Sequence, residues 1–267
     1  MKRREFLRTS VAASTLLGLS CAETKPHLGG QALRGKQEYY ELRAYRLKPG
    51  GSHDLLDTYL EQVALPTWNG LGVKPVGVFT EPEPKGPPQV FVLIPYPSIE
   101  SLAAATARLN AALPQETAAR DYLQTPKNNP AFDRIDSWLM LAFAGMPKLE
   151  LPAYSREKRP RMFEIRTYES HNEIKALKKV EMFNSGEIDV MQEVGLAPVF
   201  YGQALVGPSL PHLTYMLSAE NRDAHKQHWA AFGKHPTWNK MKDDPAYADT
   251  VSTIRNWFVV PTDYSQI

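Results

Sequence analysis

Two short segments of the chain carry glutamate, arginine and tyrosine at alternate positions. The first is Tyr40-Glu-Leu-Arg-Ala-Tyr45 and the second is Phe163-Glu-Ile-Arg-Thr-Tyr168. Alternation of this kind is typical of a β-strand, in which every second side chain lies on the same face. Arginine on such a face can bind a carboxylate with two parallel hydrogen bonds, and glutamate or tyrosine can transfer a proton. The candidate pocket residues are Glu41, Arg43, Tyr45, Glu164, Arg166 and Tyr168.

The same rows also fit a structural role. Buried charges must be paired, and a glutamate and an arginine two residues apart on one strand face can pair with each other. The alternate residues, Tyr40 and Leu42 among them, are mostly apolar and suit packing against helices. We therefore expect the Glu-Arg-Tyr rows to face the space between two sheets, either as an internal ion-pair network or as a ligand site.

Histidines supply further candidates. His212 begins a predicted strand beside the same face, where it would act as a base, a metal ligand or a hydrogen-bonded structural residue. His225 and His228 are three residues apart on a predicted helix, a spacing that suits a metal ion. However, Trp229 and Phe232 follow His225 at four and seven residues, which places His225 on the apolar face of the helix. No metal site is predicted.

These residues belong to a sequence with an internal duplication. An offset of 123 maps Glu41 onto Glu164, and it also maps Gly72-x-x-Pro-Val onto Gly195-x-x-Pro-Val. A single offset across separated motifs indicates a duplicated domain, because the period is longer than that of a solenoid repeat.

Each copy has the same predicted order of elements, β-α-β-β-α-β, which is the ferredoxin-like unit. Proline and glycine separate the two middle strands of each copy. The predicted strands are 40–46, 74–80, 89–95 and 138–143 in the first copy, and 162–168, 197–204, 212–218 and 257–260 in the second. The predicted helices are about 52–65 and 98–112, and about 172–194 and 219–232.

The predicted domains follow from this order. Repeat 1 spans residues 38–144, a proline-containing linker spans 145–161, and repeat 2 spans 162–262. A four-stranded sheet with helices on one face leaves its other face uncovered, and two copies in one chain can cover each other. The expected fold is therefore α+β: two tandem ferredoxin-like repeats that form an intrachain dimeric α/β-barrel.

Several motifs resemble those of the NIPSNAP family. They are the Glu-Leu-Arg and Glu-Ile-Arg strand openings, the Gly-x-x-Pro-Val segments, His212-Leu-Thr-Tyr, and Trp229-x-x-Phe with His235-Pro-Thr-Trp238. The second copy matches better, since Gln89 stands in the first copy where His212 stands in the second. The resemblance covers nearly all of 38–260. It implies the dimeric α/β-barrel superfamily, which includes haem enzymes, cofactor-independent monooxygenases and members without catalytic activity.

The resemblance implies no settled reaction. We expect an exported NIPSNAP-like protein of unproven activity that binds a small ligand or a protein partner. The alternatives are a cofactor-independent or haem-dependent oxygenase, with Glu164, Arg166, Tyr168 and His212 around its pocket, and a scaffold domain at the cell envelope. No cofactor is predicted, although the superfamily allows haem on His212 or His225, and a homo-oligomer fits the resemblance.

The N-terminus predicts export. Residues 1–22 combine a charged start, a short apolar stretch and small residues, and the string around Arg3 and Arg4 resembles a twin-arginine signal. Cleavage after Ala22 and lipidation of Cys21 both fit its end. Residues 23–37 are predicted to form a tether, and the expected location is the periplasm or the cell envelope.

Composition excludes several classes of protein. Without residues 1–22 the chain has 27 basic and 28 acidic side chains, so it lacks the basic excess that nucleic-acid binding requires. The apolar run from Val11 to Leu19 is too short to cross a bilayer. Cys21 is the single cysteine. The chain after residue 22 therefore has no disulfide, thiolate nucleophile or cysteine-bound metal.

Overall fold

The computed structural model describes residues 36–49 and 51–267, and within them eight antiparallel strands close into one barrel. The order around the barrel is β1-β3-β2-β8-β5-β7-β6-β4, so each repeat supplies four strands. This arrangement confirms the expected α+β fold and the intrachain barrel. The strands are β1 (Tyr39–Arg46), β2 (Gly77–Thr80), β3 (Gln89–Tyr96) and β4 (Arg134–Ala142) in the first repeat, and β5 (Met162–Glu169), β6 (Pro198–Val206), β7 (His212–Ala219) and β8 (Thr253–Pro261) in the second.

Two seams join the repeats, and they are related by the internal pseudo-symmetry. In one seam β2 pairs with β8, with Thr80 opposite Val260. In the other seam β4 pairs with β6, with Ala142 opposite Gly202. Each repeat therefore contributes its second and last strands to the contacts that close the barrel, and neither sheet keeps an open edge at the seams.

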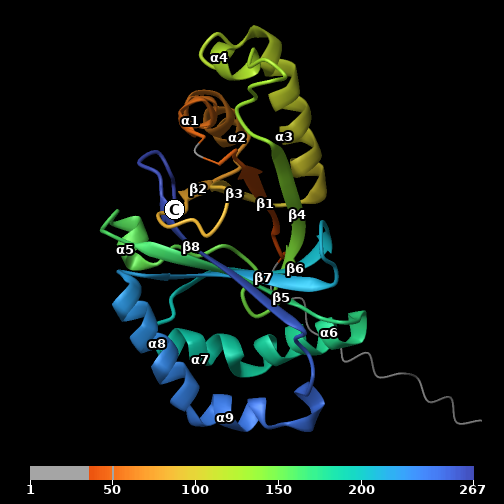
Figure 1. Cartoon of the computed structure of the whole chain (residues 1–267). Coiled ribbons are helices and arrows are strands. Elements are labelled where there is room, and N and C mark those ends of the chain that lie inside the picture. The colour runs from red at the N-terminus through yellow and green to blue at the C-terminus, as the bar shows by residue number, and fades with distance from the viewer. Residues whose placement is uncertain (1–35, 50) are drawn as a thin grey trace, which may run out of the picture. The chain divides into compact units, whose positions relative to one another are not determined.

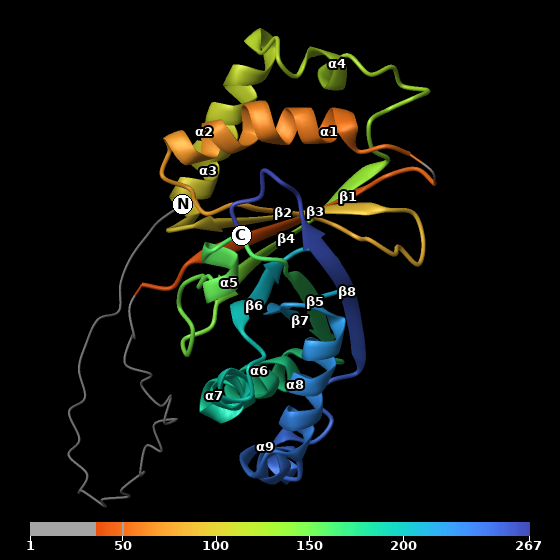
Figure 2. The ribbon, with the colours of Figure 1, turned by 90° about the vertical axis from the view of Figure 1, so that its left-hand side faces the viewer.

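The helices of the two repeats cover opposite sides of the barrel (Figures 1 and 2). A short π-helical turn interrupts the first helix of each repeat at equivalent positions, η1 (Leu60–Ala64) and η3 (Phe183–Glu187). The first repeat has α1 (Asp54–Tyr59), α2 (Leu65–Gly70), α3 (Ile99–Ala112), η2 (Leu113–Gln115) and α4 (Arg120–Leu123). The segment between the repeats holds α5 (Ala153–Arg156), and the second repeat has α6 (Glu173–Met182), α7 (Ile188–Glu193), α8 (Arg222–Lys234), α9 (Pro236–Lys242) and η4 (Pro245–Tyr247).

Apolar side chains from both repeats fill the barrel interior. Tyr40 contacts Phe200 with 5.0 Å between ring centroids, and Phe79 contacts Phe163 at the same separation. All four rings are fully buried. These contacts cross from one repeat to the other, so burial of aromatic surface holds the two halves together.

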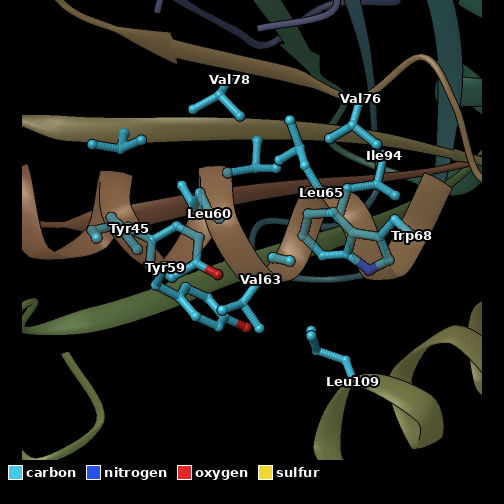
Figure 3. Close-up of a cluster of buried hydrophobic side chains, with 14 of the residues drawn as sticks. Tyr45, Tyr59, Leu60, Val63, Leu65, Trp68, Val76, Val78, Ile94 and Leu109 are labelled. Atoms are coloured by element: carbon cyan, nitrogen blue, oxygen red, sulfur yellow. The ribbon is translucent and has the colours of Figure 1, made fainter. Parts of the chain in front are cut away.

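A separate apolar core lies between each sheet and its helices. Figure 3 shows this core in the first repeat, where Tyr59, Val63 and Trp68 of the helical segment meet the outer face of the sheet. Tyr45 of strand β1 belongs to this core and is 1% exposed. The sheet is therefore covered on both faces, by the partner sheet inside and by helices outside.

The predicted elements are all present, with shifts at their ends. The last strand of each repeat begins about four residues earlier than expected, at Arg134 and Thr253, because polar and charged residues at the barrel rim continue the ladder. After β8 the chain stays beside the first repeat, where the amide of Gln266 donates to the carbonyl of Val76. In the part of the chain that the structure describes, no helix has the length and apolarity needed to cross a bilayer.

Candidate functional site

The Glu-Arg-Tyr rows face the helices and not the barrel interior, so the predicted inward orientation is wrong. Tyr45 and Tyr168 belong to the helix-side cores, whereas Leu42 and Ile165 belong to the interior. The physical reason is that both faces of each sheet are covered. The closed interior takes the apolar row, and the charged row lies where helices and solvent offer it polar partners. This correction applies to Glu41, Arg43, Tyr45, Glu164, Arg166 and Tyr168.

Glu164 is the centre of the polar cluster in the second repeat. Its Oε1 accepts hydrogen bonds from Nη1 of Arg166 and from Nδ2 of Asn256, both at 2.8 Å. Its Oε2 accepts from Nε2 of His225 at 2.7 Å and from Nε1 of Trp229 at 3.0 Å. The carboxylate is an acceptor only, so the His225 nitrogen that faces it carries the hydrogen. Four donors from β5, β8 and α8 thus converge on one carboxylate.

These contacts fix the ionisation of Glu164. Burial alone would raise its pKa, but the hydrogen bond from His225, the charge of Arg166 and the hydrogen bond from Asn256 outweigh burial and lower the pKa to about 2. The side chain is 1% exposed and its oxygens are occupied. Glu164 is therefore a fixed anion that orients its neighbours, and it does not serve as a general base at neutral pH.

Helix α8 brings His225 and Trp229 to this carboxylate. The helix begins after Asn221, whose side chain accepts a hydrogen bond from the amide of Ala224, a standard N-cap. His225 and Trp229 are four residues apart and so lie on one face of the helix. That face meets the outer side of the sheet next to Glu164 on β5.

Arg166 lies between aromatic rings with much of its hydrogen-bonding capacity free. Its guanidinium carbon is 4.7 Å from the centre of the Trp229 ring and 5.5 Å from that of Tyr168. It makes a single hydrogen bond to Glu164, and Nη2 is 3.4 Å from the Tyr168 hydroxyl. Its Nε has no partner. The side chain is 18% exposed, so a rigidly held cation remains accessible.

A hollow of about 410 Å³ opens above Arg166, and we call it the α8 hollow. Three cations border it, namely Arg166, Arg222 and Lys226. The strands contribute Glu164, Arg166, Asn256 and Phe258, and the helix contributes Arg222, Asp223, His225, Lys226 and Trp229. Cationic and aromatic groups together suit an anion with a planar or apolar part.

The equivalent place in the first repeat has a different arrangement. Arg43 binds both oxygens of Glu41, at 2.7 and 3.0 Å, and its guanidinium lies 5.5 Å from the ring centre of Trp68. Tyr96 and Ser137 also donate to Glu41. Arg43 thus makes two hydrogen bonds to its strand neighbour, whereas Arg166 makes one to Glu164, which also accepts hydrogen bonds from α8.

The helix residues explain this difference. The N-cap residues Ser98 and Asn221 align α3 with α8 at the same offset of 123. The residues of α3 at the positions of the cationic and aromatic lining residues are small or aliphatic: Ile99, Leu102, Ala103 and Thr106 stand where Arg222, His225, Lys226 and Trp229 stand in α8. Glu100 stands where Asp223 stands. Only the second repeat therefore has the side chains that form the cationic hollow.

Tyr168 extends the network away from the hollow. Its hydroxyl accepts a hydrogen bond from Tyr215 at 2.8 Å, and burial raises the pKa of both phenols, so both stay protonated at neutral pH. Nearby, the ammonium group of Lys179 donates to Glu187 at 2.7 Å. Both side chains are at most 5% exposed, so this is a buried ion pair.

His212 does not join this cluster, and its predicted position beside the Glu-Arg-Tyr row is wrong. It shares a strand face with Thr214 and Met216, and Met216 lies in the barrel interior. Its Nδ1 is 3.3 Å from the Thr214 hydroxyl, and its Nε2 has no partner. Burial lowers the pKa of His212. The strand places it on the opposite side of the sheet from Glu164.

Neither candidate histidine fits as a haem ligand. His212 is 2% exposed inside the barrel and does not line the α8 hollow. His225 directs Nε2 to Glu164, and its Nδ1 is buried. Among residues 36–49 and 51–267, no group of three or more histidine, cysteine or acidic side chains is arranged to hold a metal ion.

The sequence did not assign six residues of the hollow to a site. They are Arg222, Asp223, Lys226, Trp229, Asn256 and Phe258. A comparison of the two repeats could have found the helix residues. Charged and aromatic residues of α8 stand where α3 has small or aliphatic ones, at the fixed offset of 123. The export residues Arg3, Arg4 and Cys21, with the signal 1–22 and most of the tether, lie outside the described residues.

Comparisons with known proteins agree with the duplicated fold. The family model named NIPSNAP matches residues 40–144 and 163–266. No curated protein matches the chain. A proposed monooxygenase from Lactobacillus acidophilus has a TM-score of 0.52 at 8% identity, over 84% of this chain and 94% of its own.

Two further solved structures are similar. A proposed monooxygenase from Fusobacterium nucleatum has a TM-score of 0.51 at 8% identity, over 84% of this chain and 92% of its own. An uncharacterised NIPSNAP-like domain protein from Burkholderia xenovorans has a TM-score of 0.36 at 16% identity, over 40% of this chain and 90% of its own. At these identities the matches to the two larger structures show the barrel fold and no reaction.

Proposed function

Because the chain belongs to the NIPSNAP family, we propose that it is an exported protein that binds a small molecule in the α8 hollow of its second repeat. The observation that carries the proposal is the state of Arg166. Its guanidinium is held between Trp229 and Glu164, yet the Arg166 side chain is 18% exposed and lines a hollow of about 410 Å³. A fixed cation beside a pocket of this volume is a typical small-ligand site.

The contrast between the repeats supports ligand binding over a purely structural role. A structural ion pair needs only the bidentate contact that Arg43 makes with Glu41. In the second repeat His225 and Trp229 occupy one oxygen of Glu164 and leave Arg166 with a single bond to it. The glutamate–arginine pair of the second repeat thus adjoins a histidine, an indole and two further cations that line a hollow.

The indole of Trp229 provides a direct test. We would label the protein with 15N-tryptophan, assign the Trp229 indole signal with Trp229→Phe, and add small organic anions and their uncharged analogues. Binding in the α8 hollow should shift the Trp229 signal and leave the signal of Trp68, in the first repeat, unchanged. A Trp229 signal that stays fixed for every compound at millimolar concentration would refute the proposal.

Further measurements on the same compounds separate the alternatives. An oxygenase would consume a bound compound with uptake of oxygen, which an electrode measures. A protein partner would bind without any small molecule in the hollow. The structural likeness to proposed monooxygenases rests on 8% identity and so does not transfer their reaction.

Export rests on the sequence of residues 1–22. Replacement of Arg3 and Arg4 by lysine in the full-length chain should retain the protein in the cytoplasm of a bacterium that has the twin-arginine pathway. Cys21→Ser should release it from the membrane fraction if Cys21 is lipidated, and should change nothing if cleavage follows Ala22. Wild-type protein found only in the cytoplasm would refute export.

A further inference from the structure

We propose that the ligand of the α8 hollow is an amphipathic monocarboxylate, with its carboxylate at Arg166 and its apolar part on the far side of Phe258. This inference rests on the proposed function, because it concerns the same hollow. Three observations support it: the neighbouring hollow, the side chain between the two hollows, and the charge of the lining.

A second hollow adjoins the first and is mainly apolar. Its volume is about 370 Å³, and we call it the β8 hollow. Met162, Val260 and Pro82 are among the side chains that line it. Arg222 and Phe258 line both hollows, so the two share one wall. Their combined volume lies in the range of pockets that hold small organic molecules.

The shared wall is weakly held. The guanidinium carbon of Arg222 is 3.5 Å from the centre of the Phe258 ring. Its nearest carboxylate is that of Glu83, at 3.9 Å, and both side chains are largely exposed at 53% and 85%. An exposed ion pair at this distance contributes little. Arg222 can therefore turn from the ring toward a bound anion and join the two hollows.

The charge of the α8 hollow favours a single negative charge. Arg166, Arg222 and Lys226 oppose two carboxylates, Glu164 and Asp223. With the His225 imidazole neutral, one uncompensated positive charge remains. A monoanion neutralises this charge, whereas a phosphate dianion would exceed it. A carboxylate also matches the planar fork of arginine. The apolar lining of the β8 hollow indicates that the ligand also has an apolar part. Burial of each CH₂ group of this part should improve affinity about fourfold.

Calorimetry with butanoate, hexanoate and octanoate tests the inference, with octanol and octyl phosphate as controls for charge. Affinity should rise about threefold to fourfold per CH₂ group up to the length that fills the β8 hollow. Octanol and octyl phosphate should each bind at least tenfold more weakly than octanoate. Equal or tighter binding of octyl phosphate, or of octanol, overturns the monocarboxylate.

A variant with a matched control locates the apolar part. Val260→Trp fills the β8 hollow and should reduce octanoate affinity to that of butanoate, with butanoate unaffected. Leu141 is the eighth residue of β4, as Val260 is of β8, and Leu141→Trp should change the affinity for neither acid. Octanoate binding that survives Val260→Trp overturns the placement.

The two proposals fail in different ways. If short and long acids shift the Trp229 indole signal equally and bind with equal affinity, a ligand site exists but the amphipathic ligand is wrong. If neither acid shifts that signal, the α8 hollow does not bind these acids and the inference is overturned. If other anions also leave the signal unchanged, the proposed function falls as well.

Discussion

Nε2 of His225 lies 2.7 Å from Oε2 of Glu164 and links helix α8 to strand β5. The equivalent pair in the first repeat is Leu102 and Glu41, which form no such link. The His225 contact ties the glutamate–arginine pair of the second repeat to the helix. A histidine in place of a leucine thereby joins this pair to the helix residues that line the α8 hollow.

The low pKa of Glu164 predicts acid sensitivity. A carboxyl with a pKa of about 2 in the folded state and 4.5 in the unfolded state gives stability that is complete above about pH 5 and lost as pH falls toward 2. The expected contribution is about 3 kcal/mol. Urea unfolding of Glu164→Gln and wild type should differ by about this amount at pH 7, and the difference should shrink steadily below pH 5.

The matched control for this prediction is Glu181→Gln. Glu181 pairs with Lys178 on the exposed surface of α6, so its replacement should cost less than about 1 kcal/mol at pH 7. A Glu164→Gln variant that is no less stable than Glu181→Gln would contradict the four-donor arrangement.

The buried pair of Lys179 and Glu187 predicts strong coupling. Lys179→Met should destabilise the protein by about 3–5 kcal/mol, because it leaves Glu187 buried without a cation. Burial already raises the pKa of Glu187, so the loss should be smaller at low pH, where that carboxyl is protonated.

The first repeat indicates a double variant that should restore the lost stability. Leu56 and Ala64 stand at the positions of Lys179 and Glu187. The double variant Lys179→Leu with Glu187→Ala should therefore recover most of the stability that Lys179→Met loses. Urea unfolding measures both variants, and equal losses in the two would show that the charges are not coupled.

Much of the fold could be predicted from the sequence, because the evidence is local. Alternation predicts β1 and β5, and one offset repeated along the chain predicts the duplication. Which strand face turns inward is not local information. Tyr40 and Leu42 suit a helix contact as well as a barrel interior, and only the closure of eight strands decides between them.

The site was predictable in part. Glu164 and Arg166 were identified by type and spacing, but the other three donors to Glu164 come from α8 and β8, about 60 and 90 residues away. Lys179 and Glu187 were missed for a different reason. An α-helix brings residue i+7 near residue i, and the extra residue of the π-helical turn η3 makes this i+8.

We predict that the backbone conformation at position 186, in η3, requires glycine. Its φ of +144° is one that residues with a side chain rarely adopt, so Gly186→Ala should destabilise by about 1–2 kcal/mol. Gly233→Ala, in α8 with open space around the added methyl group, should instead stabilise by about 0.4–1 kcal/mol. Thermal unfolding of the two variants should shift in opposite directions, and a destabilised Gly233→Ala would undermine the comparison.

His212 predicts a second pH effect in a separate range. Burial lowers its pKa, so the folded protein holds this imidazole neutral while the unfolded chain takes up a proton near pH 6.5. Stability should therefore fall as pH drops below about 6.5, before the Glu164 effect begins near pH 5. His212→Gln removes this titration, so the stability of wild type relative to the variant should decline between pH 7.5 and 5.5. A constant difference across that range would show that His212 takes up its proton equally well in both states, and would place solvent beside an imidazole that the structure buries in the barrel.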